Sequence, residues 1–377
     1  RMVARAAMVP VIEPSDSEEA RMFIKRAFEL SEQYDTPIMF RTTTRLAHSQ
    51  GVVHLEERQQ IPDKPYEKNI AKNVMMPGNA IKRHLVVEER LKKMAADAAT
   101  LDINKVEYND TKIGVITSGI PYQYVKEVLP NASVLKLGLV HPLPKTLIEE
   151  FASRVDTLYI VEELEPVIEE QVKSWGIKCI GKEIFTVQGE YSANMLRRAI
   201  LKEDLDLEEA AQVPARPPIL CPGCPHRSVF FVLNRLKMHA AGDIGCYTLG
   251  AVAPLNAMDL NVCMGASCSG LHGFNKAMGK EGEKRSVGVI GDSTFIHSGI
   301  TGITDIAYNM SNSTVIILDN SITGMTGHQQ NPTTGKNLRG EPAGKVNLEA
   351  LCRAIGFNRV RVVDPYNLEE VDTVLKE

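Results

Sequence analysis

The 377-residue sequence is 44% hydrophobic and 24% charged and has a formal net charge of −4, so we expect two or three domains, each with its own core. That charge offers no general basic surface for nucleic acid or anionic membranes, and no apolar run approaches the roughly 20 residues of a membrane span. Charges also interrupt the start, where a signal peptide would be apolar, so we expect a cytoplasmic protein, and Arg1 indicates a chain that begins inside a longer one.

The first block, residues 1–53, predicts one helix and a following strand. Ser15 and Glu18 match the capping-box pattern that starts helices. The helix should bury one apolar face, made of Phe23, Ile24, Ala27 and Phe28. A short strand is expected over "TPIMFRTTTR" after the helix. These elements are too few for a complete core, so the block is interpreted as the C-terminal end of a domain.

Residues 54–110 are polar and mixed in charge, and they are interpreted as a connector with a helix over 80–99. Strands and helices then alternate over residues 111–205, which predicts an α/β domain with a parallel sheet covered on both faces. A proline-containing linker, residues 206–219, precedes the last domain, residues 220–377.

In the last domain, "SVGVIGDSTF" followed by "GITGITDIAYNM" indicates a strand, a tight turn and a helix. Anionic ligands bind at the carboxyl ends of parallel strands and at helix N-termini. Gly291 would let the backbone approach such a ligand, and the N–H groups of Ser293 and Thr294 would point at phosphate oxygens. Asp292 is unsuited to touch a phosphate directly, but it suits a Mg²⁺ ion that joins the protein to a diphosphate.

The next strand supplies a second ligand for this ion, because Asn320 closes "TVIILDN" 28 positions after Asp292. The Asn320 amide oxygen and the Ile322 carbonyl would complete the protein's share of the magnesium shell. The pattern resembles the thiamine diphosphate signature, although Ser293 and Asp319 depart from its usual residues. A bare Gly-Asp turn is more often structural, but the second polar group at this distance favours a cofactor site. Neither a P-loop nor a dinucleotide-binding glycine pattern is present.

Five of the seven cysteines lie in the last domain before residue 270. Cys221 and Cys224 have C-x₂-C spacing, Cys246 follows in "GDIGCYTLG", and Cys263 and Cys268 come from "VCMGASCSG". The spacing suits zinc, an iron–sulfur cluster, a redox dithiol or an inert turn.

Five segments, taken together and in order, resemble the α subunits of indolepyruvate:ferredoxin oxidoreductases. They are "CPGCPHR", "GDIGCYTLG", "MGASCSG", "GDSTFIHSGITG" and "DNSITGMTGHQQNPTTGK". The resemblance implies an α/β fold of transketolase-like, thiamine diphosphate-binding domains with a transketolase-C-terminal-like domain. Residues 1–53 would end the pyrimidine-binding domain, residues 111–205 would form the transketolase-C-terminal-like domain, and residues 220–377 would form the diphosphate-binding domain.

The resemblance implies oxidative decarboxylation of aryl pyruvates, such as indolepyruvate and phenylpyruvate, to aryl-acetyl-CoA with electrons passing to ferredoxin. Coenzyme A would take the acyl group, and a β subunit would complete a hetero-oligomeric enzyme of aromatic amino acid catabolism. By similarity, the cofactor would be lined by Gly245, Cys246, Tyr247, Met264, Gly265, Ala266, Ile322, Thr323, Gly324, Met325 and Thr326. Cys221, Cys224 and Cys246 match three ligands of a [4Fe–4S] cluster, whose fourth ligand would lie beyond Glu377.

The resemblance places the glutamate that activates the cofactor's aminopyrimidine before the first residue of this chain. The sequence contains no C-x₂-C-x₂-C-x₃-C run, the pattern that would indicate a ferredoxin-like domain. We therefore expect the chain alone to be inactive. Two alternatives remain open: the same chemistry on pyruvate or 2-oxoglutarate, and a non-catalytic, cysteine-rich subunit that binds a metal or cluster.

Several other residues have a functional and a structural interpretation. His297 and His328 are candidates for the active site, His297 being the only candidate for acid–base catalysis. His226 is interpreted as packing locally rather than binding zinc. Glu162 and Glu163 are interpreted as a solvated strand end, and Trp175 as a packing residue.

Overall fold

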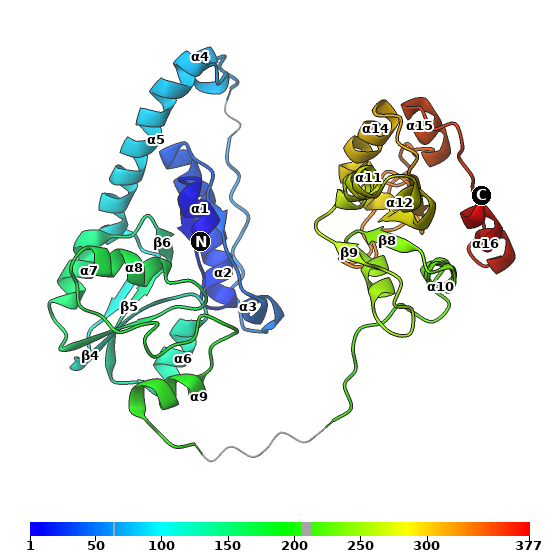
Figure 1. Ribbon diagram of the computed structural model, residues 1–377. Helices are drawn as coiled ribbons and strands as arrows, with labels where there is room; N and C mark the ends of the chain where they lie inside the picture. The colour runs from blue at the N-terminus through cyan, green and yellow to red at the C-terminus, as the bar shows by residue number, and fades with distance from the viewer. Residues whose placement is uncertain (63–64, 206–212) are drawn as a thin grey trace. The chain divides into compact units, whose positions relative to one another are not determined.

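The computed structural model describes residues 1–62, 65–205 and 213–377, and the chain divides into two compact units, Arg1–Ala210 and Ala211–Glu377 (Figure 1). The boundary falls inside the predicted linker 206–219, of which residues 206–212 lie outside the described residues. Within the described residues, no helix is both long enough and apolar enough to cross a membrane.

The first unit contains two sheets and the helices that cover them. Its strands are β1 (Val11–Ile12), β2 (Met39–Phe40), β3 (Lys105–Glu107), β4 (Asp110–Ser118), β5 (Ala132–Leu137), β6 (Leu139–His141) and β7 (Thr157–Val161). Its helical segments are α1 (Met2–Ala6), α2 (Ser17–Tyr34), α3 (Thr44–His48), α4 (Ile70–Asn73), α5 (Pro77–Asp97), η1 (Ala98–Thr100), α6 (Pro121–Val128), α7 (Lys145–Ala152), α8 (Val167–Ser174), α9 (Ala193–Leu196) and η2 (Arg197–Leu201).

The main sheet of this unit has the order β3-β5-β4-β7, and β5, β4 and β7 are parallel as predicted. The antiparallel edge strand β3 was not predicted. Alternate residues of β4 enter different cores because successive side chains of a strand point to opposite faces. Ile116 packs with residues of α7 and α8, whereas Val115 packs with residues of α6 and α9.

A second sheet, β2-β1-β6, joins the first block to the α/β segment, since β1 pairs in parallel with β2 and antiparallel with β6. Residues 1–53 and 111–205, which the sequence assigned to separate domains, therefore pack within one compact unit. The helix predicted over 80–99 is present as α5, and most of its surface is exposed.

The start of α2 differs from its prediction by one residue. Asp16, not Ser15, caps the helix, because its side chain accepts a hydrogen bond from the Glu19 N–H. The Glu19 carboxylate accepts from the N–H and Oγ of Ser15, the residue before the N-cap, so the predicted pairing of Ser15 with Glu18 is not formed. The predicted apolar face was also wrong in part: Ile24 and Phe28 are exposed, and the buried stripe is Phe23, Ala27, Leu30 and Tyr34.

The second unit is built on a parallel sheet of order β11-β10-β8-β9. The strands are β8 (His239–Gly242), β9 (Leu260–Asn261), β10 (Ser286–Gly291) and β11 (Thr314–Leu318). The helical segments are α10 (His226–Leu236), η3 (Cys246–Ala251), α11 (Ala266–Met278), α12 (Lys280–Arg285), α13 (Asp292–Thr294), η4 (Phe295–Gly299), α14 (Ile300–Tyr308), α15 (Leu348–Ile355) and α16 (Leu368–Lys376).

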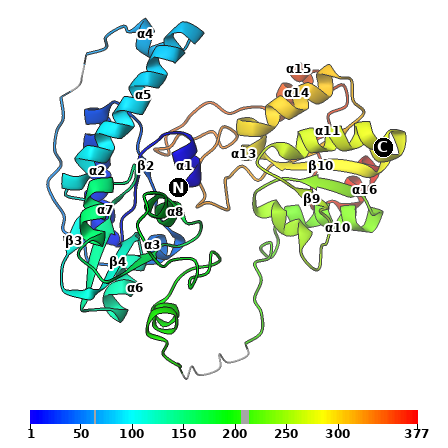
Figure 2. The same ribbon diagram turned by 60° about the vertical axis from the view of Figure 1, so that its left-hand side comes forward.

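Helices cover both faces of this sheet, and Figure 2 shows α10 and α11 on opposite sides of it. Val287 and Val289 of β10 pack in the core that includes α10. On the other face, a Cβ on Gly288 would lie 3.3 Å from Leu271 of α11. Strands β10 and β11 and helix α14 agree with the sequence prediction, whereas the short strands β8 and β9 were not predicted. The predicted α/β fold class is confirmed.

Candidate functional site

Asp292 lies at the carboxyl end of β10, where the sequence predicted a magnesium ligand. Its side chain is buried, with 2% of the residue exposed. The Thr333 hydroxyl donates to Oδ2 across 2.6 Å, and the Asn331 amide donates to the same oxygen across 3.3 Å. Both hydrogen bonds reach Oδ2, so they fix the orientation of the carboxylate and leave Oδ1 as the oxygen for a further ligand.

Asn320 follows the neighbouring strand β11, as predicted. Its Oδ1 accepts a hydrogen bond from the Ile322 N–H across 3.3 Å, which folds the start of the 320–326 loop. Its Nδ2 lies 3.4 Å from Nε2 of His226. Burial lowers the pKa of His226, against the opposing effect of the nearby Asp292 charge, so the ring is held neutral beside Asn320.

Three of the segments predicted to bind the cofactor meet around this strand end. Thr323 donates its hydroxyl hydrogen to the Ser293 hydroxyl across 3.0 Å, which joins the 320–326 loop to the turn after β10. The hydroxyl of Thr294 donates to the Ile244 carbonyl across 3.4 Å, which joins the same turn to the 244–247 segment. A Cβ on Gly324 would lie 3.5 Å from the Cys246 sulfur, so the loops at 246 and 324 are also adjacent.

Glycines in these segments allow close packing of protein on protein. A Cβ on Gly291 would lie 2.5 Å from Cε1 of Tyr247, and one on Gly245 would lie 2.3 Å from the same atom. The Tyr247 ring therefore lies where a side chain at residue 291 would be, and the approach of a ligand to the Gly291 backbone stays a prediction. Burial raises the pKa of Tyr247 to about 12, so its hydroxyl stays protonated and donates to the Ile244 carbonyl across 2.9 Å.

The 263–266 segment reaches the site from the start of α11. Gly265 has φ +87°, and a Cβ there would lie 2.7 Å from the Ser298 carbonyl oxygen, so both conformation and space require glycine. Ala266 is the first residue of α11, and Met264 is half exposed. Of the remaining loop residues, Met325 is exposed, and Thr326 donates to Gln329 Oε1 across 2.7 Å.

The candidate histidines differ in their surroundings. His297 is exposed on the π-helical segment η4, and its Nδ1 lies 2.6 Å from the Ser298 hydroxyl. His328 is exposed and has a left-handed backbone, φ +62°. Neither is placed among the hydrogen bonds around Asp292, whereas His226, which the sequence analysis interpreted as local packing, contacts Asn320.

Burial raises the pKa of the Cys246 thiol, and the neighbouring Cys224 and Cys221 raise it further. Cys221 is exposed, and the other two are partly buried. No group of three or more His, Cys, Asp or Glu side chains is arranged to hold a metal within residues 1–62, 65–205 and 213–377. The three cysteines therefore do not form a ready ligand set.

Three buried polar residues near Asp292 were not predicted from the sequence. Asn331 and Thr333 lie in a loop without hydrophobic periodicity, so no pattern in the sequence linked them to Asp292. Asp243 directly follows β8, just as Asp292 follows β10, and it is fully buried. The signal used to find Asp292, a carboxylate at a strand end, could therefore have found Asp243, had β8 been predicted.

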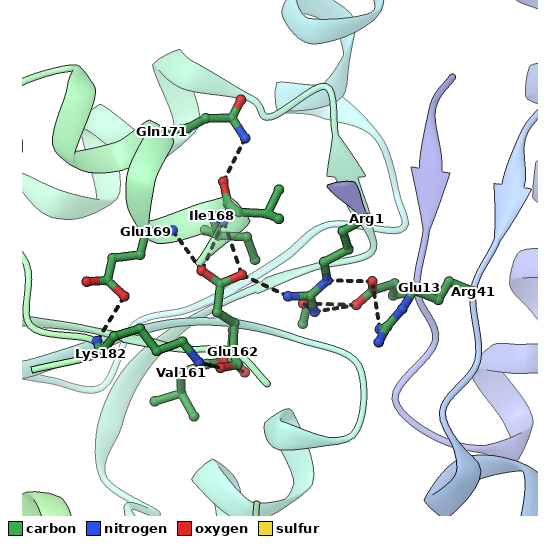
Figure 3. Close-up of polar contacts among 12 residues, drawn as sticks. Arg1, Glu13, Arg41, Val161, Glu162, Ile168, Glu169, Gln171 and Lys182 are labelled. Carbon is green, nitrogen blue, oxygen red and sulfur yellow. Dashed lines mark hydrogen bonds and ion pairs between the residues drawn. The ribbon is translucent and has the colours of Figure 1, made fainter. Parts of the chain in front are cut away.

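Glu162 and Glu163 are not the solvated strand end that was expected. Both are buried after β7, and burial raises the pKa of each carboxyl. Figure 3 shows the Arg1 guanidinium between Glu162 and Glu13, at 2.8 Å and 2.6 Å. Glu162 also accepts from the N–H groups of Ile168 and Glu169 at the start of α8. This network serves the fold of the first unit.

Several known proteins are similar to this chain in sequence. Residues 243–377 match the family described as thiamine pyrophosphate enzyme, C-terminal TPP binding domain. The chain is 37% identical to "Indolepyruvate oxidoreductase subunit IorA" of Archaeoglobus fulgidus, over 100% of the chain and 64% of that protein. It is also 37% identical to the protein of the same name from Pyrococcus horikoshii, over 100% of the chain and 65% of that protein. The chain thus spans slightly under two thirds of these relatives.

Solved structures show weaker similarity. A 2-oxoglutarate:ferredoxin oxidoreductase from Magnetococcus marinus is 17% identical with a TM-score of 0.39, covering 51% of this chain and 42% of that one. Benzoylformate decarboxylase from Polynucleobacter necessarius is 14% identical with a TM-score of 0.30, covering 96% and 72%. These scores are too low to support an argument about this chain, whereas the sequence relatives confirm the resemblance that the motifs indicated.

Proposed function

We propose that the chain, which is 37% identical to indolepyruvate oxidoreductase subunits IorA, works in the thiamine diphosphate-dependent oxidative decarboxylation of aryl pyruvates. Indolepyruvate and phenylpyruvate are the proposed substrates, and aryl-acetyl-CoA is the product. Ferredoxin takes the electrons, coenzyme A takes the acyl group, and a β subunit completes a hetero-oligomer. The relatives' name supports the indolepyruvate assignment, and the match of residues 243–377 supports the cofactor.

Within this function, the chain holds the diphosphate end of the cofactor through Mg²⁺. The observation that carries this proposal is the orientation of Asp292, whose Oδ2 accepts from Thr333 and Asn331. Oδ1, the Asn320 amide oxygen and the Ile322 carbonyl would be the protein ligands. This donor set contains only oxygen atoms, which Mg²⁺ prefers, and leaves positions for diphosphate oxygens and water. The residues therefore fit a bound Mg²⁺.

Thiamine diphosphate supplies the nucleophilic carbon and the electron sink, whereas the protein binds and orients it. The N–H groups of Ser293 and Thr294, at the start of the helix after β10, would donate to the diphosphate. Neutral His226 holds the Asn320 amide in place. Tyr247 packs against Gly291 and keeps the turn after β10 in contact with the 244–247 segment. In this scheme His297 remains a candidate for substrate contact only.

A [4Fe–4S] cluster does not fit the described residues. Such a cluster takes four thiolates, and Cys221, Cys224 and Cys246 are not arranged as a metal-binding group in the described part of the chain. No electron-transfer step is therefore assigned to these cysteines.

Substrate competition tests the proposed activity. The complete enzyme, with its partner subunit, is supplied with indolepyruvate, phenylpyruvate, pyruvate and 2-oxoglutarate, and reduction of ferredoxin is followed in the presence of coenzyme A. We expect kcat/KM for the two aryl pyruvates to exceed that for the others by at least tenfold. Preference for pyruvate or 2-oxoglutarate would contradict the aryl assignment. Absence of thiamine diphosphate-dependent turnover with every 2-oxoacid would contradict the reaction itself.

A further inference from the structure

Asp243 is a buried carboxylate that the proposed reaction does not use. It follows β8 at the same edge of the sheet as Asp292, and none of its surface is exposed. Its Oδ1 accepts from the Ile244 N–H across 2.8 Å and from the Gly265 N–H across 3.0 Å. Its Oδ2 accepts from the Gly265 N–H across 3.0 Å and from the Ser267 N–H across 3.1 Å. Main-chain donors from two separate segments therefore converge on one side chain.

One of these segments is the start of α11, a helix of 13 residues that begins after Gly265. The first N–H groups of a helix have no partner within it and attract a negative charge. Asp243 supplies that charge, since it accepts from Gly265 and Ser267. The N-terminus of α11 is thus occupied by a protein carboxylate and is not a binding site for the diphosphate.

The other segment, 244–247, directly follows Asp243. The Asp243 carbonyl accepts from the Thr248 hydroxyl across 2.8 Å and from the Asn261 amide across 3.0 Å. The Gly245 N–H in turn donates to the Thr248 hydroxyl across 3.1 Å. These bonds hold the backbone before Tyr247, whose ring lies against Gly291 at the carboxyl end of β10.

We propose that Asp243 is a positioning residue that holds the segments 244–247 and 263–266 in the arrangement that receives thiamine diphosphate. The inference rests on the proposed function, because both segments are assigned to the cofactor by resemblance. It adds a residue that does not touch the diphosphate and that acts through the main chain of its neighbours. Its four hydrogen bonds use both carboxylate oxygens as acceptors. An asparagine at this position would therefore turn its amide N–H₂ group toward a main-chain N–H donor.

Asp243→Asn tests the inference because it keeps the size of the side chain but removes one acceptor oxygen. Asp259→Asn is the matched control. The Asp259 carboxylate also accepts from a main-chain N–H, that of Ala240 in β8 across 2.7 Å, but its side chain is more than half exposed. The complete enzyme is freed of cofactor, titrated with thiamine diphosphate at saturating Mg²⁺, and assayed with its best 2-oxoacid.

We expect Asp243→Asn to raise the apparent dissociation constant of thiamine diphosphate, the cofactor constant, at least tenfold. The KM for the 2-oxoacid should stay within twofold of the parent value. Asp259→Asn should change neither constant by more than twofold. A purely structural defect would lower kcat by reducing the folded fraction and would leave the cofactor constant unchanged. An unchanged cofactor constant in Asp243→Asn, or an equal rise in both variants, would overturn the inference.

If Asp243→Asn does not fold, Ser267→Pro is the second variant. Proline is tolerated in the first turn of a helix, and here it removes the Ser267 N–H from the Asp243 carboxylate together with the buried Ser267 hydroxyl. This variant should raise the cofactor constant at least threefold, and no change would overturn the inference. If the parent enzyme itself does not bind thiamine diphosphate, the proposed function fails, which is a different outcome from parent binding that Asp243→Asn leaves intact.

Discussion

Thr333 donates its hydroxyl hydrogen to Asp292 across 2.6 Å, although the two residues are 41 positions apart in the sequence. Both are buried, so water does not compete for this bond. The loop after β11 therefore returns to the strand end where the cofactor's metal ion is proposed to bind, and it sets which carboxylate oxygen is available there.

Thr333→Val should weaken Mg²⁺-dependent binding of thiamine diphosphate about tenfold or more, because a hydrogen bond to a charged group contributes roughly 1.5–3 kcal/mol. Thr304→Val is the control, since Thr304 donates to the Ile300 carbonyl on the exposed side of α14. Calorimetric titration of both variants measures the change. Equal affinities in the two variants would show that Thr333 does not orient Asp292 for binding.

Gly291→Ala should destabilise the second unit by about 1–3 kcal/mol, as expected for overpacking, because the new Cβ would lie 2.5 Å from the Tyr247 ring. Gly273→Ala, in the middle of α11, is the control, since a Cβ there meets no atom within 4 Å. The control should be neutral or stabilising, because alanine favours helices over glycine. Denaturant unfolding measures both, and a neutral Gly291→Ala would contradict the packing described.

Arg1→Met should lower the free energy of unfolding by about 3–5 kcal/mol, because it leaves the buried Glu162 carboxylate without its guanidinium partner and leaves Glu13 with Arg41 alone. Arg154→Met removes an ion pair with Glu150 in which both side chains are more than half exposed. The cost there should be about 1 kcal/mol or less. Similar losses in the two variants would mean that the buried network contributes no more than a surface pair.

The same network predicts a pH dependence. Burial alone would raise the pKa of Glu13, but the Arg1 and Arg41 charges lower it from 4.5 to about 2. A lowered carboxyl pKa stabilises the fold above pH 4.5, and this contribution is lost as the pH falls from 4.5 through 2. Glu13→Gln should remove that dependence, so the difference in unfolding free energy between parent and variant should shrink by about 3 kcal/mol over this range. A constant difference would contradict the assignment.

The sequence predicted the parts of the fold that hydrophobic patterns define. The long strands β4, β10 and β11 and the helix α5 were expected close to where they lie. The strands β1, β2, β8 and β9 have two to four residues, which is too few for a period to be visible, so β8, β9 and the pairing of β1 with β6 were missed. Ile24 and Phe28 were misassigned because only tertiary packing decides which apolar stripe of α2 faces the core.

The site was predictable where polar residues follow a recognisable strand. Asp292 and Asn320 satisfy that condition, and the structure places both at one sheet edge. The contacts of Thr333 and Asn331 with Asp292 could not be predicted, because the loop between β11 and α15, residues 319–347, has no local pattern that records its path. Glu162 was misjudged for a related reason: its partners, Arg1 and the start of α8, come from distant and later segments.

The central claim, that this chain holds thiamine diphosphate through Mg²⁺ at Asp292, is tested most directly by one anaerobic titration. The protein is titrated with thiamine diphosphate with and without Mg²⁺, and the parent is compared with Asp292→Ala. We predict that the parent binds only with Mg²⁺ and that the variant does not bind. Binding without Mg²⁺, or equal binding by folded Asp292→Ala, would contradict the claim.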